Sequence, residues 1–181
     1  MTLPPIPVVL APYDDAWPEM AARYADVLYS LGPNLVAVHH IGSTAVAGLT
    51  AKPIIDLMPV VTSLTKLDRQ MPHVTALGFV WHGELGIAGR RYCSLSAENG
   101  RRLAQLHFFE VASPNIARHL AFRDYLRTHH AVAKAYEQEK RRARDLYPTD
   151  SHAYGREKSA WIKAKEVEAL AWFQEQESRL S

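Results

Sequence analysis

Apolar residues along the chain repeat with two different periods, one typical of strands and one typical of helices. Alternating or continuous apolar runs of strand length occupy 35–41, 54–61, 79–82, 90–96 and 103–111. The last two runs flank Glu98-Asn99-Gly100, a strong turn signal, and therefore predict a hairpin. The pattern predicts a small mixed sheet of about five strands.

Helical spacing dominates the rest of the chain, and it fills the C-terminal half. The predicted helices cover 14–31, 64–77, 116–128, 131–146 and a segment from Tyr154 to about Ser178. An Asp cap at Asp14-Asp15 is expected to begin the first helix, and Pro72 is expected to break the second. Ser113-Pro114 is expected to open the third. The fold class is thus α+β, with helices flanking the sheet.

Composition adds limits to this picture. With 181 residues the chain is expected to form a single domain over 1–181. A net charge of +2 does not favour nucleic acid as a partner. One cysteine, Cys93, excludes an internal disulfide and fits a reducing, cytoplasmic setting. We expect neither a signal peptide nor a membrane span, because the chain lacks the apolar runs that they need.

The candidate chemistry lies between the first two predicted strands. The first strand ends in a tight turn, Gly42-Ser43, and a small-residue segment then leads through Lys52 to Asp56 on the second strand. Glycine and serine at a strand end let backbone N–H groups approach an anion, and a carboxylate nearby can hold a divalent metal. The pattern indicates a site for a phosphorylated ligand with a metal. The alternative is an ordinary turn followed by a turn aspartate.

Four stretches resemble one known family. "HIGSTAVAGLTAKPIIDLMPVV" at 40–61 looks like the signature of the GrpB family, and "PYDDAW", "FRDYLRTHHAVAKAYEQEK" and "YGREKSAWI" agree with it. That family is largely uncharacterised and resembles the nucleotidyltransferase superfamily. The resemblance implies a nucleotide ligand, Mg²⁺ as cofactor and Asp56 as the catalytic, metal-binding carboxylate. It also implies that the nucleotide's phosphates are bound by Gly42, Ser43, Thr44, Lys52, Arg123 and Lys158.

The chain departs from the two-metal pattern of that superfamily at one position. Two carboxylates two residues apart share a strand face and hold two metal ions, but the partner of Asp56 is Met58, whose thioether is a poor Mg²⁺ ligand. Another carboxylate would have to replace it, with Glu110, Glu84 and Asp124 as candidates. His107 matches a family histidine and either contacts the metal beside Asp56 or is a hydrogen-bonded core histidine.

Basic residues in the helical half allow two interpretations. Arg123 either binds a triphosphate or forms a structural ion pair, and neighbouring Arg123 and Asp124 are expected to need separate partners. The basic run 140–144 is expected to be a solvated face, because acidic residues surround it. Lys158 either reaches a phosphate or extends over the surface.

Two functions follow from these features. The first is a metal-dependent nucleotidyltransferase with an unknown acceptor. The second is a non-catalytic nucleotide- or cofactor-binding module, which agrees with the occurrence of GrpB-like regions fused to dephospho-coenzyme A kinases. A carboxylate within metal-bridging reach of Asp56 would favour the first, and its absence the second.

Overall fold

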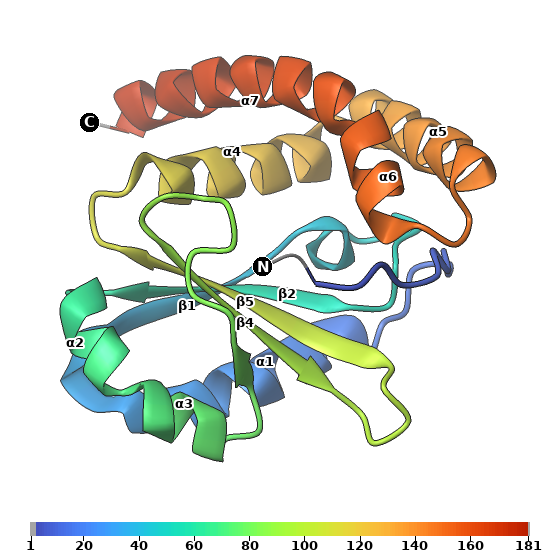
Figure 1. Cartoon of the computed structure of the whole chain (residues 1–181). Helices are drawn as coiled ribbons and strands as arrows, with labels where there is room; N and C mark the ends of the chain where they lie inside the picture. Colours follow the sequence, from blue (N-terminus) through green and yellow to red (C-terminus); the bar gives the residue numbers. More distant parts are fainter. Residues whose placement is uncertain (1–2, 181) are drawn as a thin grey trace.

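A five-stranded sheet forms the centre of the computed structural model, which describes residues 3–180 (Figure 1). The strands are β1 (Leu35–Ile41), β2 (Ile55–Val61), β3 (Val80–Trp81), β4 (Arg90–Ser96) and β5 (Arg102–Glu110). Their order is β1-β2-β5-β4-β3, with β2 and β5 parallel and every other pair antiparallel. The predicted mixed sheet is therefore confirmed, and each predicted strand is present.

Strand register gathers polar positions at one end of the sheet. Asp56 on β2 lies opposite Ile41 at the end of β1 and opposite Gln105 near the start of β5. The turn that follows Ile41 therefore begins beside Asp56. This sheet end carries the candidate site.

Helices cover both faces of the sheet (Figure 1). They are α1 (Trp17–Leu28), α2 (Leu64–Arg69), α3 (Met71–Ala76), α4 (Pro114–Thr128), α5 (His130–Leu146), α6 (Ser151–Glu157) and α7 (Ser159–Leu180), with short 3₁₀ segments at Tyr29–Asn34 and Ser43–Ala45. Figure 1 shows α1, α2 and α3 on one face and α4 to α7 on the other. From 114 to 180 the chain is helical or forms short connections, so the predicted helical C-terminal half is confirmed.

Helix boundaries differ from the predictions in two places. The first helix begins at Trp17, because the Asp14 carboxylate accepts a hydrogen bond from Ala16 N at 2.9 Å and closes a turn ahead of it. The last predicted helix is two helices, and Asp150 caps the first by accepting from His152 N and Ala153 N. The break expected at Pro72 is confirmed, since α2 ends and α3 begins beside it.

Two apolar cores position the sheet between the helix layers. The larger lies under α1 to α3 and includes Trp17, Leu57 and Phe108. The smaller lies on the opposite face, where Ile41, Met58 and Phe109 pack against Ile116 and Leu120 of α4. Among residues 3–180, no helix combines the length and the apolar character that a membrane crossing requires.

Candidate functional site

The turn after β1 is pressed against the Asp56 carboxylate. Gly42 has φ +72°, and a Cβ there would lie 2.8 Å from Asp56 Oδ2. Only glycine fits this position, because any side chain would be strained and would collide with Asp56. The chain then closes the 3₁₀ segment, and Ala45 N donates to Gly42 O at 3.2 Å. The sequence thus holds a backbone turn and a carboxylate side by side.

His40, near the end of β1, contacts this turn through the side chain of Thr44. His40 Nε2 lies 2.9 Å from the hydroxyl of Thr44, which is 1% exposed. Burial lowers the pKa of His40 to about 4, so the ring is neutral at pH 7. Thr44 is therefore held in place by a neutral hydrogen bond.

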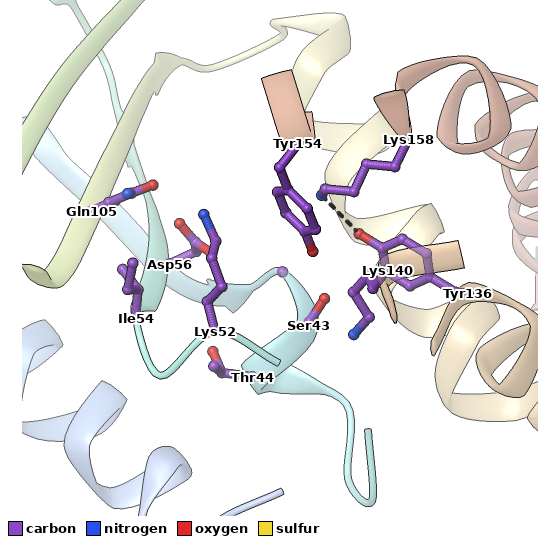
Figure 2. A pocket seen from close by; sticks show the side chains of 11 residues that line it. Ser43, Thr44, Lys52, Ile54, Asp56, Gln105, Tyr136, Lys140, Tyr154 and Lys158 are labelled. Carbon is purple, nitrogen blue, oxygen red and sulfur yellow. Dashed lines mark hydrogen bonds between the residues drawn. The ribbon is translucent and has the colours of Figure 1, made fainter. Parts of the chain in front are cut away.

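A cavity of about 250 Å³ opens beside the turn (Figure 2). Most of the residues predicted for the site line it, namely Gly42, Ser43, Thr44, Lys52, Asp56 and Lys158. The sequence analysis missed the others, which are Ile54, Gln105, Tyr136, Lys140 and Tyr154. Arg123 and His107 are not among the lining residues. We call this space the basic cavity.

Three lysines from separate parts of the chain converge on the basic cavity (Figure 2). Lys140 of α5 is 2% exposed, and its ammonium donates to the carbonyl of Thr50. Lys158, between α6 and α7, has Nζ 3.4 Å from the hydroxyl of Tyr136. Lys52 Nζ lies 5.5 Å from the ring centroid of Tyr154. Within residues 3–180, none of these lysines has an ion pair with a carboxylate.

Burial makes the charged forms of two of these lysines, Lys140 and Lys52, unfavourable when no anion is bound. Loss of solvent, together with the positive charge of Lys158, lowers the pKa of Lys140 to about 7. The same two causes lower the pKa of Lys52. Charged groups are rarely buried without a partner, because their hydration is lost. The basic cavity is thus complementary to an anion with several negative charges.

Among the described residues, Asp56 is the one carboxylate that lines the basic cavity, and His107 approaches it from β5. His107 Nε2 lies 3.4 Å from Asp56 Oδ1, and Arg90 Nη1 lies 3.4 Å from His107 Nδ1. A guanidinium only donates, so Nδ1 is the acceptor and a neutral His107 carries its proton on Nε2, toward Asp56. This geometry favours a hydrogen-bonded His107 over a metal ligand.

Within residues 3–180, the lining of the basic cavity offers no second carboxylate to complete a two-metal site with Asp56. Met58 is 0% exposed beneath α4. Glu110 accepts from Leu64 N at 2.8 Å at the start of α2, and Glu84 accepts from Gly89 N at 2.8 Å. Within residues 3–180, no group of three or more His, Cys, Asp or Glu side chains is placed to hold a metal. The residues therefore do not fit two metal ions, although one carboxylate together with ligand phosphates is a usual Mg²⁺ environment.

Arg123 lies outside the basic cavity and contacts the end of β1, just ahead of the turn, from α4. Its guanidinium donates to the carbonyl of His40 at 3.1 Å and forms two bonds with Asp124, at 2.7 and 2.9 Å. The expectation that these neighbours need separate partners is wrong, because the long arginine side chain folds back onto the next residue. Arg127 Nε also donates to Ala45 O at 2.9 Å. Both arginines thus hold the backbone of the turn or of the strand end just ahead of it.

The basic run on α5 is solvated except at its first residue. Arg141, Arg142 and Arg144 pair with Glu137, Glu139 and Asp145 at 2.6, 2.7 and 2.6 Å, as the prediction of a charged face requires. The prediction is wrong for Lys140, which is buried. The sequence contained one indication of this burial, because the spacing of Tyr136, Lys140 and Ala143 places them on one face of a helix. All three side chains are buried in the structure.

Comparisons with known proteins agree on the family. The model of the family GrpB protein matches residues 7–167. The protein YqkA of Bacillus subtilis is 37% identical over 161 residues, which are 88% of this chain and 46% of that protein, so the chain spans about half of its length. The crystal structure of conserved protein GrpB from Enterococcus faecalis matches with a TM-score of 0.86 and 35% identity, over 92% of this chain and 99% of that one.

Two further comparisons concern the fold and a fused relative. A structure of the Cid1 poly(U) polymerase with Mg 3'-dATP bound matches with a TM-score of 0.54 at 16% identity, over 81% of this chain and 49% of that one. This likeness shows a shared nucleotidyltransferase fold and no more. The dephospho-CoA kinase of Mycobacterium bovis is 38% identical over 77 residues, which are 40% of this chain and 19% of that protein.

Proposed function

The chain belongs to the GrpB family and has the nucleotidyltransferase fold, and we propose that its basic cavity binds the phosphate groups of a nucleotide. The observation that carries this proposal is the convergence of three lysines, none ion-paired within residues 3–180, on a cavity that Gly42 and Ser43 of the turn also line. A bound polyphosphate would give each ammonium a negatively charged partner in place of the uncharged contacts that the protein provides.

The charges of the cavity indicate how many phosphates it takes. Lys52, Lys140 and Lys158 oppose the single negative charge of Asp56. Charge-assisted hydrogen bonds from ammonium to phosphate contribute about 1.5–3 kcal/mol each. A diphosphate or triphosphate reaches three ammonium groups from separate elements, which a single phosphate does less well. We therefore favour a nucleoside di- or triphosphate.

Binding without two-metal catalysis fits these residues best. The phosphate turn and the cations are present, but Met58 occupies the position of the second carboxylate. Cations on α5 and at Lys158 supply positive charge that does not depend on bound metal. The proposed function is accordingly that of a nucleotide- or cofactor-binding module.

Isothermal titration with ATP and with tripolyphosphate, each with and without Mg²⁺, tests this function. Lys158→Met should weaken binding of both ligands at least about tenfold, because it removes one charge-assisted contact. Lys134→Met is the matched control, since Lys134 is an exposed lysine of α5 that does not line the basic cavity. Failure of the native chain to bind either ligand, or equal binding by Lys158→Met, would contradict the proposal.

Nucleotidyl transfer is the second candidate, and the place of Asp56 in the cavity favours it. With Mg²⁺ and an acceptor nucleophile present, transfer would break the bond between the α- and β-phosphates of a nucleoside triphosphate, join the nucleotidyl group to the acceptor and release pyrophosphate, and Asp56→Asn should abolish that release. A non-catalytic binding module predicts a gain from the same substitution when no metal is present. Asp56→Asn should then bind tripolyphosphate more tightly, because a negative charge that repels the ligand has been removed. Pyrophosphate release that depends on both Mg²⁺ and Asp56 would establish the transferase.

A further inference from the structure

A second cavity, of about 380 Å³, borders the basic one and shares Lys52 and Ile54 with it. Its other walls come from an N-terminal strap, residues 6–9, and from the tip of the β4–β5 hairpin, residues 99–102. The two spaces therefore lie on either side of the segment that leads into β2. A ligand that reaches past this shared wall would contact both linings.

The strap is held in place by α5, which carries Lys140, and by α6, which precedes Lys158. Ile6 N donates to Ser151 Oγ at 3.0 Å, and Ser151 N donates to Ile6 O at 3.1 Å. Val8 is 5% exposed and packs against Ala143 of α5 and Tyr154 of α6. Backbone hydrogen bonds and buried apolar contacts make this wall pre-formed, which lowers the entropic cost of binding.

The second cavity differs chemically from the first. Ile6, Pro7, Val9, Pro53 and Ile54 give it an apolar lining. Two guanidinium groups complete its rim. Arg102 is fixed by hydrogen bonds to Tyr92 Oη at 3.3 Å and Ser96 Oγ at 3.2 Å. Arg101 is exposed, and its guanidinium has no hydrogen-bond or ion-pair partner within residues 3–180. A free guanidinium above an apolar surface suits a planar ring, on which it stacks.

We propose that this second cavity binds the base of a nucleotide whose phosphates occupy the basic cavity. The inference rests on the proposed function and deepens it, because it assigns the ligand to the nucleoside polyphosphates. A highly charged group and a planar, largely apolar group, joined by a sugar, match the two adjoining linings. Inorganic polyphosphate would leave the second cavity empty.

Comparison of ATP with tripolyphosphate tests the inference directly. The native chain should bind ATP at least about tenfold more tightly than tripolyphosphate, in line with about 1–3 kcal/mol for stacking of a base. Val9→Asn and Arg101→Lys should each weaken ATP binding about three- to tenfold and leave tripolyphosphate within about twofold. Arg101→Lys keeps the charge and removes the planar group, so its effect separates stacking from electrostatic attraction.

We expect these variants to fold like the native chain, because the substituted side chains are exposed to solvent. Val9 is 61% exposed, and Val167→Asn, at a valine that is 70% exposed on α7, is the matched control. Equal affinities of the native chain for ATP and tripolyphosphate would overturn the base site and leave the phosphate site intact. Unchanged ATP affinity in both Val9→Asn and Arg101→Lys would also overturn the base site and leave the phosphate site intact. If neither ligand binds, the proposed function fails and the base site fails with it.

Discussion

Replacement of Lys140 by methionine should stabilise the ligand-free protein while it weakens anion binding. Lys140 is 2% exposed, and burial lowers its pKa from 10.5 to about 7. A tenfold change in an equilibrium constant is worth about 1.4 kcal/mol, so this lysine costs the folded state about 5 kcal/mol at pH 7. Methionine has a similar length and carries no charge, so the variant removes that cost.

Lost contacts offset part of this gain. The Thr50 carbonyl loses its donor, which costs about 1–3 kcal/mol when a buried acceptor is left alone. The ammonium also lies 4.7 Å from the centre of the Tyr136 ring, a contact worth about 1 kcal/mol. We expect a net stabilisation of about 2 kcal/mol, which for a chain of this size raises Tm by about 4–8 °C.

Urea denaturation and thermal melting of the ligand-free protein measure the first effect, and titration with tripolyphosphate measures the second. Affinity should fall at least about tenfold, and Lys134→Met should change neither quantity. The pH dependence adds an independent check. Because the folded pKa of Lys140 is lowered, the unfolded chain binds one more proton at this group between about pH 7 and 10.5, and Lys140 contributes a rise of native stability with pH across that window. The pKa of Lys52 is lowered as well, so Lys140→Met should show a smaller rise than the native chain.

A lower Tm for Lys140→Met, with the same pH dependence as the native chain, would refute the reasoning. It would mean that the contacts with Thr50 and Tyr136 compensate the buried charge. Lys140 would then be part of the structure, and an anionic ligand would no longer be needed to explain the lysines of the basic cavity.

Two further predictions concern the turn and its support. Gly42→Ala should lower the free energy of unfolding by about 1–3 kcal/mol more than Gly48→Ala, because both glycines have positive φ but only a Cβ at Gly42 meets Asp56. Urea denaturation of both variants measures the difference, and equal losses would contradict the close approach. Arg123→Met should destabilise the fold by about 1–3 kcal/mol and leave tripolyphosphate affinity within about twofold, since its guanidinium contacts the backbone just ahead of the turn and not the cavity. A tenfold loss of affinity at unchanged stability would instead favour a direct phosphate contact.

Much of the fold follows from local patterns in the sequence. Strand periodicity at 35–41 and 90–96 predicts the observed bounds of β1 and β4 without change. Pro72 ends one helix and lies at the start of the next for the simple reason that its ring lacks an N–H donor. These features depend on a few neighbouring residues, so the sequence reports them directly.

The composition of the basic cavity depends on long-range packing and was only partly predicted. Gly42, Ser43 and Asp56 lie close in sequence and could be grouped by spacing. Tyr136 and Lys140 lie on α5, and only the packing of that helix against the turn brings them there. Lys140 also belongs to a basic run whose other charged members are solvated. The charge pattern therefore predicted a solvated Lys140, whereas the structure has it buried.

The structure also bears on the two interpretations that the sequence left open for Arg123. Arg123 has the chemistry of a phosphate ligand, and the resemblance implied that role. In the structure its guanidinium is already occupied by Asp124 and by the carbonyl of His40. A motif identifies which residues matter near a site, but only coordinates separate those that face a ligand from those that hold the backbone.

Burial of Met58 links the fold to the proposed function. Asp56 and Met58 lie on one face of β2. Met58 is covered by α4 through Ile116 and Leu120, whereas Asp56 lines the basic cavity. A carboxylate at 58 would therefore be buried among apolar side chains, where its charge is costly. The face that two metal ions would need is thus part of the apolar core, while lysines from the helical half bring positive charge to the other side of Asp56. This division of the strand favours an anion held by ammonium groups over an anion held by a metal pair.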